Sequence, residues 1–429
     1  MALPPGPREP AALQTVEWIA RPTAFLRRAQ ARHGEPFTVR VAWADAPMVV
    51  VSHPEEIRRV FTADPAVLHG GASSTVLEPF AGPSSILVLD GAEHLRQRRL
   101  LLPSFHGAAL EGWRATVTEL ARAELAGWRP GAPLRTHARM QALTLEVILR
   151  VVFGPGQHAA LRTAIRRALD MTRSLPRVVA MSLSRGPAWR AFLRAVADVD
   201  AGLRAELARP APEGTLLAVL QAARHEDGSP PTEGELRDQV VTVLAAGHET
   251  TAGSLAWALE RLARHPAVLS RMREQDPEYL DAVVKEVLRV RPVLSIAARR
   301  LEQPYEVGGH TLPPGVHVAP CIYLAHRRPE AWSEPTAFRP ERFLGPPPAP
   351  YTYLPFGGGP RRCAGAAFAT LELREVLAEV ARRFALRAPA RRTERMRRGS
   401  VTLMPSAGAT VVPKPLQPSE CRSSAATVV

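Results

Sequence analysis

The chain has 429 residues, of which 46% are apolar and 22% are charged, a composition that excludes a disordered chain and allows a large buried core. Its formal net charge of +14 is compatible with nucleic-acid binding. However, the arginines are spread over all helix-like stretches, without a basic block or an interleaved aromatic platform. We therefore expect no nucleic-acid partner and attribute the charge to an Arg-rich composition.

The N-terminal part is predicted to combine an extended segment with helices and a hairpin. Prolines favour an extended arm over about residues 1–12. The elements expected after it are a helical stretch around Val16 to Ala31, a hairpin with strands at Phe37 to Trp43 and Met48 to Val51, and a short helix over His53 to Phe61 with Ser52 as its N-cap.

From about residue 92 to 290 the hydrophobic periodicity is mostly helical. The expected helices cover 92–102, 109–128, 137–153, 158–173, 187–209, 214–225, 232–263 and 279–290. The strongest of them is 232–263, because Thr232 and Glu235 have the spacing of a capping box at its start.

After Pro292 the chain changes to short strand-like pieces, followed by an irregular Pro-rich stretch over 329–360. A last long helix is expected at about 364–385, and a flexible tail over about 413–429. We find no internal repeat and no linker. The sequence therefore predicts a single domain over residues 1–429, mainly α with a smaller β part.

The N-terminus and the cysteines bear on the location of the protein. Residues 1–10 lack the apolar core of a signal peptide, and no apolar run is long enough to span a bilayer. Cys321, Cys363 and Cys421 are odd in number and form no CxxC pair, which argues against a disulfide framework and a structural zinc site. We expect a cytoplasmic protein without a transmembrane anchor.

The sharpest local signal is Phe356–Gly365, Phe-Gly-Gly-Gly-Pro-Arg-Arg-Cys-Ala-Gly, which we call the cysteine turn. Its glycines let the backbone pass close to a flat, bulky group, and Gly365 leaves room at the start of the next helix. Cys363 directly precedes that helix, where amide groups favour a thiolate, and Arg361 can reach an anionic group beside the sulfur. A thiolate held there is a good axial ligand for haem iron. The alternatives are a turn around an inert cysteine, which leaves the other positions unexplained, and a phosphate loop, whose Gly-Lys-Ser/Thr ending is missing.

A second signal lies within the strongest predicted helix, as Ala246-Gly-His-Glu-Thr-Thr251. Glycine and threonine are poor choices for a helix interior, so we expect a local opening that admits water or a small molecule. The hydroxyl of Thr250 beside the carboxylate of Glu249 can order water and pass protons inward. The alternative is a threonine that bonds back to its own helix carbonyl.

A third signal is the pair Glu286 and Arg289, which lie on one helix face and can form an ion pair. Arg342, in the later segment Phe338–Phe343, can join the pair and hold the irregular stretch that precedes the cysteine turn. The pattern Glu-x-x-Arg is frequent in this Arg-rich chain, so only its position gives it weight.

A fourth signal is the pair His94 and Arg98, which are four residues apart and therefore share a helix face. Together they can hold a carboxylate, and Arg299 is a further candidate donor for the same purpose. The alternative in each case is a solvated helix face.

Taken together and in this order, these residues resemble the cytochrome P450 family over nearly the whole chain. The resemblance implies the cytochrome P450 fold, with haem b as the cofactor. It also implies a bacterial haem-thiolate monooxygenase, an oxidoreductase that acts on paired donors and incorporates molecular oxygen. The one departure in the cysteine turn is Pro360, which stiffens the loop directly before Arg361.

The resemblance also implies roles for the quoted residues. Cys363 would be the axial thiolate ligand of haem b, and Phe356 a neighbour that tunes the thiolate. The acid–alcohol pair that delivers protons to dioxygen would be Glu249 and Thr250, and the structural triad would be Glu286, Arg289 and Arg342. The contacts of the haem propionates would be His94, Arg98, Arg299 and Arg361.

By the same resemblance, no fused reductase is present, and a separate ferredoxin and ferredoxin reductase supply electrons to a monomeric enzyme. Excess positive charge on the cysteine face would suit an acidic ferredoxin. The substrate pocket should be lined by mostly aliphatic stretches at 65–89, Leu244 to Thr250, Val293 to Ala297 and Val401 to Leu403. These favour an apolar substrate such as a fatty acid or a terpene, in line with the bacterial branch that the chain resembles.

Two other functions remain open on the same cysteine turn. A peroxide-driven haem-thiolate peroxygenase would not need Thr250, so the pair Glu249–Thr250 counts against it. A non-catalytic haem-binding protein would need neither a proton path nor a redox partner.

Overall fold

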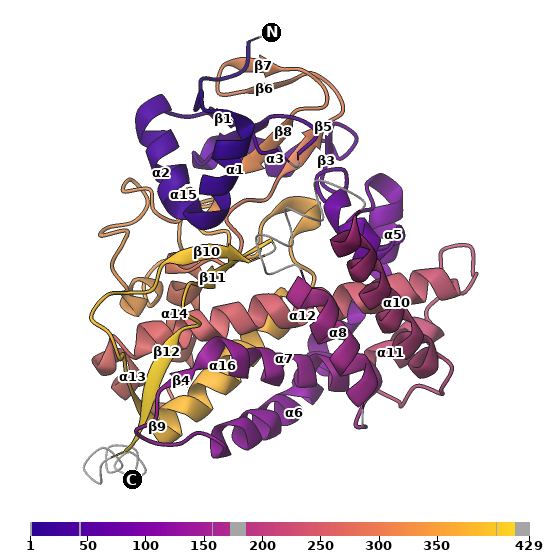
Figure 1. The fold of residues 1–429 in the computed structure, drawn as a ribbon, viewed down its shortest axis with the longest axis vertical. Coiled ribbons are helices and arrows are strands. Elements are labelled where there is room, and N and C mark those ends of the chain that lie inside the picture. The colour runs from indigo at the N-terminus through magenta and orange to yellow at the C-terminus, as the bar shows by residue number, and fades with distance from the viewer. Residues whose placement is uncertain (1, 43, 157, 172–185, 400, 417–429) are drawn as a thin grey trace.

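The computed structural model describes residues 2–42, 44–156, 158–171, 186–399 and 401–416. Figure 1 shows a helical part built around the long helix α12 and a strand-rich part that contains the N-terminus. The predicted fold class, mainly α with a smaller β part, is confirmed.

The helices and strands have the following bounds. The α-helices are α1 (Ala11–Ala20), α2 (Pro22–His33), α3 (Pro54–Thr62), α4 (Glu78–Ala81), α5 (Gly91–Leu101), α6 (Gly107–Ala126), α7 (Thr136–Phe153), α8 (Ala159–Met171), α10 (Pro187–Leu207), α11 (Leu216–Ala222), α12 (Glu233–Leu262), α13 (Pro266–Arg271), α14 (Pro277–Val290), α15 (Ile322–Ala325) and α16 (Ala366–Arg383). The strands are β1 (Phe37–Val39), β2 (Met48–Val51), β3 (Leu68–His69), β4 (Leu134–Arg135), β5 (Arg299–Leu301), β6 (Tyr305–Val307), β7 (His310–Leu312), β8 (His317–Pro320), β9 (Phe384–Arg387), β10 (Met396–Gly399), β11 (Thr402–Pro405) and β12 (Thr410–Pro415).

The helical stretch predicted around Val16 to Ala31 is present, and it consists of two helices, α1 and α2. They meet at Arg21, whose φ of −140° and ψ of 52° are not helical. Pro22 is the first residue of α2, and it has no amide hydrogen with which to continue α1. The helices expected between 92 and 290 are present with shifted ends, and residues 172–173 of one of them lie outside the described residues.

The predicted hairpin is confirmed, since β1 pairs antiparallel with β2, with Phe37 opposite Val50. Its first strand is shorter than expected and ends at Val39. The N-cap of α3 is His53 and not Ser52, because Nδ1 of His53 accepts the amide hydrogen of Glu55 at 3.3 Å.

The N-terminal arm packs against β1. Thr38 donates its hydroxyl to the carbonyl of Pro4 at 2.6 Å and its amide to the carbonyl of Pro5 at 2.9 Å. Helix α1 begins at Ala11, so the extended arm ends one residue before it and not at residue 12. Beyond the hairpin, β2 pairs in parallel with β8, which places the start of the chain beside the segment that leads to the cysteine turn.

Helix α12 crosses the middle of the molecule and packs chiefly on α7 (Figure 1). Its capping box is present: the Thr232 hydroxyl accepts the Glu235 amide at 3.2 Å, and the Glu235 carboxylate accepts the Thr232 amide at 2.8 Å. At Gly247 the two helices are so close that a Cβ atom would lie 3.0 Å from Cδ1 of Ile148. This close contact places the 246–251 motif directly against α7.

At the C-terminal end, α16 continues into β9, which pairs antiparallel with β12 between Phe384 and Pro415. Strand pairing therefore extends beyond residue 413, where the flexible tail was expected to begin. Residues 417–429, including Cys421, lie outside the described residues. Within the described ranges, none of the helices combines the length and the apolar character needed to cross a bilayer.

Candidate active site

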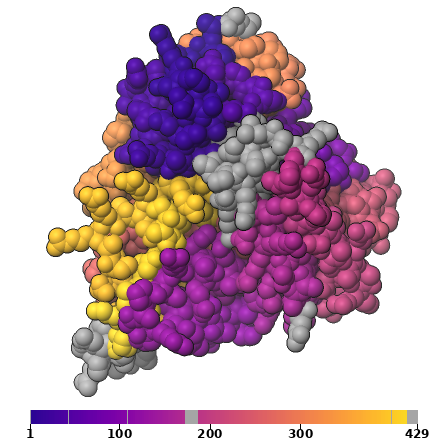
Figure 2. All heavy atoms as spheres, viewed as in Figure 1, coloured from indigo at the N-terminus to yellow at the C-terminus, as the bar shows by residue number. Residues whose placement is uncertain are grey.

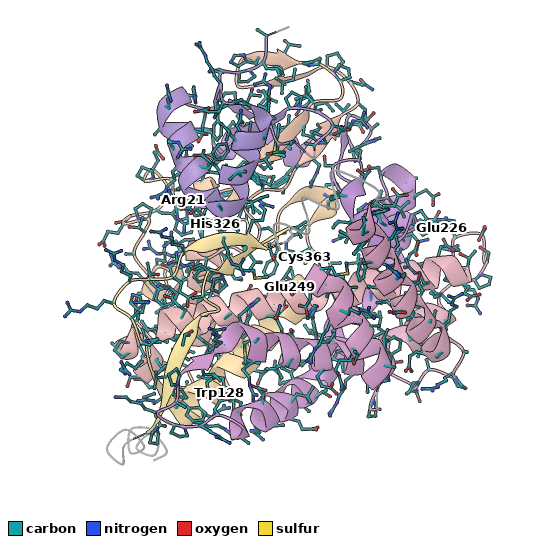
Figure 3. The ribbon with its side chains drawn as sticks, viewed as in Figure 1. Arg21, Trp128, Glu226, Glu249, His326 and Cys363 are labelled. Carbon is teal, nitrogen blue, oxygen red and sulfur yellow. The ribbon has the colours of Figure 1, made fainter. Side chains whose placement is uncertain are left out.

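The cysteine turn lies between the strand-rich part and α16, where Figure 3 labels Cys363. The amide of Cys363 donates a hydrogen bond to the carbonyl of Phe356 at 3.0 Å, which closes the turn. Gly357 and Gly359 both have a φ of +67°, a left-handed conformation that favours glycine. A Cβ atom at Gly358 would lie 2.4 Å from the ring of Phe61, and one at Gly359 would lie 2.2 Å from the Phe61 carbonyl oxygen. The glycines therefore let the turn lie directly against α3.

Cys363 is a free cysteine that is exposed on a hollow of about 350 Å³, which we call the cysteine hollow. Residues that line it include Arg98, Leu102, Phe356, Arg362 and Arg374. Although the side chain is exposed there, the protein around it raises the pKa of the Cys363 thiol above its usual value by burial. A hydrogen bond to the Gly365 amide and the charges of Arg98 and Arg362 lower that pKa, but they do not outweigh burial. The amide at the helix start thus acts in the expected direction, but desolvation exceeds its effect in the chain without haem.

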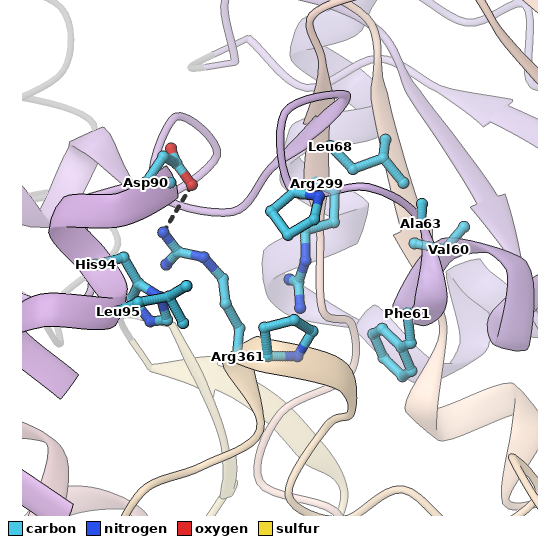
Figure 4. Close-up of a pocket in the computed structure, with 12 residues that line it drawn as sticks. Val60, Phe61, Ala63, Leu68, Asp90, His94, Leu95, Arg299 and Arg361 are labelled. Carbon is cyan, nitrogen blue, oxygen red and sulfur yellow. Dashed lines mark hydrogen bonds and ion pairs between the residues drawn. The ribbon is translucent and has the colours of Figure 1, made fainter. Parts of the chain in front are cut away.

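A second, smaller pocket of about 30 Å³ lies beside the turn and collects side chains from four segments (Figure 4). His94 comes from α5, Arg299 from β5, Arg361 from the cysteine turn and Phe61 from α3. We call it the cation pocket. The sequence signals at His94, Arg299 and Arg361 thus meet in space, although more than 260 residues of chain separate the first from the last.

The charges in the cation pocket are only partly neutralised. Arg361 lies 2.6 Å from the carboxylate of Asp90, as the dashed line in Figure 4 shows. Arg299 donates to the carbonyl of Ala298 at 2.9 Å and has no carboxylate partner among the described residues. Burial, with the nearby charge of Arg361, lowers the pKa of Arg299 to about 10. Burial also lowers the pKa of His94 to about 4, so this imidazole is neutral at pH 7.

Arg98 lies one helical turn after His94 and lines the cysteine hollow instead of the cation pocket. Its side chain forms no hydrogen bond or ion pair with any residue that the structure describes, and burial lowers its pKa. An arginine without a countercharge is a ready site for an anion, so Arg98 and Arg299 present two such sites, both close enough to Arg361 to be affected by its charge.

The motif on α12 differs from expectation in its backbone. The helix runs without interruption through 246–251, so the predicted local opening is absent. Instead, the hydroxyl of Thr250 donates to the carbonyl of Ala246 at 2.6 Å, the bond back to its own helix that was the alternative interpretation. The carboxylate of Glu249 accepts a hydrogen bond at 2.8 Å from the amide of Gln141 on α7. The acid and the alcohol therefore take different partners.

The predicted ion pair of Glu286 and Arg289 is present and fully buried on α14. Arg342 joins it, with its Nε 3.2 Å from the Glu286 carboxylate. Arg289 also donates to the carbonyls of His326, Pro335 and Ala337, which belong to the irregular stretch before the cysteine turn. The group thus connects α14 to that stretch.

Sequence reasoning missed Asp90, whose carboxylate accepts the amides of Gly70, Gly71 and Ala72 as well as Arg361. Its position directly before a helix start was an available signal. It also missed Glu372 on α16, a buried carboxyl for which the described residues supply no hydrogen bond, and whose pKa burial raises well above its usual value.

A family model described as Cytochrome P450 matches residues 4–412. The chain belongs to the cytochrome P450 family. Cytochrome P450 135B1 and 135A1 of Mycobacterium tuberculosis are 40% and 39% identical to it over 431 and 400 residues, which cover 96% and 90% of this chain and 91% and 89% of theirs. Cytochrome P450 138 of Mycobacterium bovis is 35% identical, covering 96% of both chains.

Solved structures have the same fold. Cyanobacterial CYP120A1 with bound retinoic acid has a TM-score of 0.84 at 24% identity, covering 97% of this chain and 100% of its own. The haem domain of cytochrome P450DA has a TM-score of 0.85 at 24% identity, covering 97% and 98%. Members of the cytochrome P450 family bind haem b and are monooxygenases, so this chain is a haem-dependent oxidoreductase.

Proposed function

We propose that this cytochrome P450 binds its haem iron through Cys363 and hydroxylates or epoxidises an apolar small molecule such as a fatty acid or a terpene. Its electrons come from a separate ferredoxin and ferredoxin reductase. The observation that carries the proposal is the convergence of one exposed cysteine, on a glycine-rich turn, with guanidinium groups that lack carboxylate partners.

The charges of the site fit haem b, which carries two propionates. Arg98, Arg299 and Arg361 contribute three positive charges, Asp90 contributes one negative charge, and His94 is neutral at pH 7. The two positive charges that remain equal the two negative charges of the propionates. There is also open space at Gly365, two residues after Cys363, because a Cβ atom there would meet no other atom within 4 Å.

In this arrangement Cys363 would hold the iron, while Arg98, Arg299 and Arg361 would hold the propionates and neutral His94 would offer a ring N–H. When bound, the haem supplies the activation of dioxygen, which a thiolate ligand promotes. Cys363 would release its thiol proton to solvent when haem binds, and Arg98 and Arg362 would stabilise the negative charge on the sulfur.

Thr250 and Glu249 are proposed to deliver protons. The Thr250 hydroxyl holds its proton on the Ala246 carbonyl, so rotation about the Cα–Cβ bond makes this proton available to a neighbouring oxygen atom. The Glu249 carboxylate, on the side of α7, can pass a proton inward when it exchanges Gln141 for water. The partly buried Gln141 keeps that carboxylate in position until then.

A basic surface around Cys363 supports an acidic electron donor. Arg362 is exposed and has no ion-pair partner among the described residues, and Arg98 lies in the same hollow. Arg114 and Arg374 also line it, although each already pairs with a carboxylate, Glu375 and Asp281 respectively. Unpaired positive charge here favours docking of an acidic protein close to the thiolate.

Apolar residues support an apolar substrate. Val293 and Leu403 are buried and joined by a hydrogen bond of 2.7 Å between the Leu403 amide and the Val293 carbonyl. Both come from stretches that the family resemblance assigns to the substrate pocket. A protein of the same fold, CYP120A1, was solved with retinoic acid, an apolar molecule with a carboxylate.

The spectrum of the reduced, carbon-monoxide-bound protein tests the proposal. We expect the wild type to have the red-shifted Soret band of a thiolate ligand and Cys363→Ser to lack it. Cys321→Ala is the matched control, because Cys321 is also a free cysteine but is fully buried at the start of α15. An unchanged band in Cys363→Ser would overturn the ligand assignment.

A further inference from the structure

Arg398 on β10 occupies an unusual environment. Its guanidinium lies 4.9 Å from the ring centre of Trp18 on α1, donates to the Ser295 hydroxyl at 3.0 Å and donates to the Val401 carbonyl at 3.3 Å. Its Nε atom is buried without a hydrogen-bond partner. The residue as a whole keeps partial exposure.

No carboxylate of the described residues pairs with Arg398. Burial is the sole cause that lowers its pKa to about 10, so the group is charged at pH 7 and no other charge compensates it. Burying a cation without a countercharge is unfavourable. The guanidinium therefore has unused capacity to bind an anion.

Three other buried arginines differ in this respect. Arg289 has Glu286 as its countercharge, and Arg291 and Arg327 both donate to the Val290 carbonyl at the end of α14. There they meet the negative end of the helix dipole. Arg398 lies on a strand and has neither kind of compensation.

The segments around Arg398 pack against α12 close to Thr250 of the candidate active site. Val293 and Met404 both contact Gly253 of α12, where a Cβ atom would lie 3.3 Å from Val293 and 3.1 Å from Met404. Gly253 is three residues after Thr250, so it lies about one helical turn along the same helix. The β10–β11 hairpin and the 293–297 segment thus lie over the part of α12 that carries Thr250.

The same region reaches the molecular surface. Figure 2 shows the C-terminal segments, in yellow, between the N-terminal helices in indigo and the helical part in magenta. Leu294 and Val401 are 36% and 39% exposed. Leu294 directly precedes Ser295, whose hydroxyl accepts a hydrogen bond from Arg398, and Val401 supplies the carbonyl that accepts the other one. A cation flanked by exposed aliphatic side chains matches a ligand with a carboxylate and an apolar chain.

We infer that Arg398 binds the carboxylate of a long-chain acid whose apolar chain passes Leu294 and Val401 toward Thr250. This rests on the proposed function, and it narrows the substrate class from apolar molecules in general to amphipathic acids. Ser295 positions the guanidinium, and Trp18 covers the face that the carboxylate does not use. No candidate anchor of this kind was evident from the sequence.

Binding of matched acids and alcohols to the haem-loaded protein tests the inference. The probes are the saturated fatty acids of ten to eighteen carbons and the alcohols of the same lengths, measured by calorimetry and by the spin-state change of the haem. For the best chain length we expect the acid to bind about ten- to a hundred-fold more tightly than its alcohol, because the acid alone forms a charged hydrogen bond.

Three variants separate binding from structure. Arg398→Gln should bring the acid-to-alcohol ratio close to one while alcohol affinity stays within about twofold, whereas Arg398→Lys should keep part of the preference because it keeps the charge. Arg397→Gln is the matched control, since Arg397 is exposed on the same strand, and it should keep the full ratio. A purely structural Arg398 would instead lower the melting temperature and affect acid and alcohol equally.

The inference is overturned if no acid binds more tightly than its alcohol, or if Arg398→Gln retains the preference. Either result leaves the proposed function standing as long as the reduced, carbon-monoxide-bound protein has the thiolate Soret band. Loss of that band in the wild type would instead overturn the proposed function, and calorimetry would still report the acid preference independently of it.

Discussion

Nε of Arg289 lies 2.7 Å from Oε2 of Glu286, and neither side chain is exposed to solvent. Replacing Glu286 with glutamine leaves the guanidinium buried without its countercharge. We therefore expect Glu286→Gln to lower the free energy of unfolding by about 3–5 kcal/mol, as measured by urea denaturation.

The exposed pair of Arg339 and Glu334 is the control for this prediction. Arg339→Gln should cost less than about 1 kcal/mol, because water screens exposed ion pairs. Equal losses in the two variants would show that burial of the Glu286–Arg289 pair does not determine its contribution.

Arg299→Gln should have opposite effects on the two forms of the protein. The haem-free chain should gain about 1–3 kcal/mol, because an uncompensated buried cation is removed. The haem-loaded protein should lose haem faster, because one propionate contact is lost. Thermal unfolding of the haem-free chain and transfer of haem to apomyoglobin measure the two effects, and a change of the same sign in both would contradict the assignment.

Thr250→Ala should reduce the product formed per electron pair by roughly tenfold or more, while reductant and oxygen are still consumed. Product and reductant measured together give this ratio. Ser254→Ala is the control, because Ser254 also donates its hydroxyl to a carbonyl of α12, that of Thr250, at 3.0 Å. Equally tight coupling in both variants would remove Thr250 from the proton path.

Arg362→Glu should raise the ferredoxin concentration needed for half-maximal turnover by roughly tenfold at low salt, and by much less at high salt. The reason is that Arg362 is exposed beside Cys363 without an ion-pair partner in the described parts of the chain. Arg339→Glu reverses a charge outside the cysteine hollow and should leave turnover unchanged. An effect that does not depend on salt would argue against electrostatic docking.

Glu372 should make stability depend on pH. Its pKa is raised in the folded protein, so above the usual glutamate pKa the unfolded chain ionises while the folded one stays protonated. The unfolded state then binds fewer protons, and the free energy of unfolding falls as pH rises, by up to about 1.4 kcal/mol per pH unit, until the raised pKa is reached. Glu372→Gln should remove this slope in urea denaturation between pH 5 and 8, and parallel curves for the two proteins would contradict the prediction.

Features that depend on neighbours along the chain can be predicted from the sequence. The capping box of Thr232 and Glu235, the pair Glu286–Arg289 and the glycines of the cysteine turn are all present as expected. In each case, spacing of three or four residues or a local backbone requirement defines the feature. The break before Pro22 follows in the same way from a local backbone requirement.

Features that depend on distant segments cannot be read so directly. Arg398 and Glu372 are defined by the absence of a countercharge or hydrogen bond around them, and no local pattern marks such burial. The interpretation of α12 failed for a related reason: contact with Ile148 on α7 supports the helix at Gly247, where propensity alone suggested an opening.

The contact of Gly358 and Gly359 with Phe61 has a mechanical consequence. Because Gly358 and Gly359 have no side chains, the backbone of the turn packs directly on Phe61 of α3, and no intervening side chain can rearrange to absorb a displacement. The cysteine turn and α3 should therefore move as one rigid unit. Glycine, usually associated with pliant segments, is here the source of stiffness.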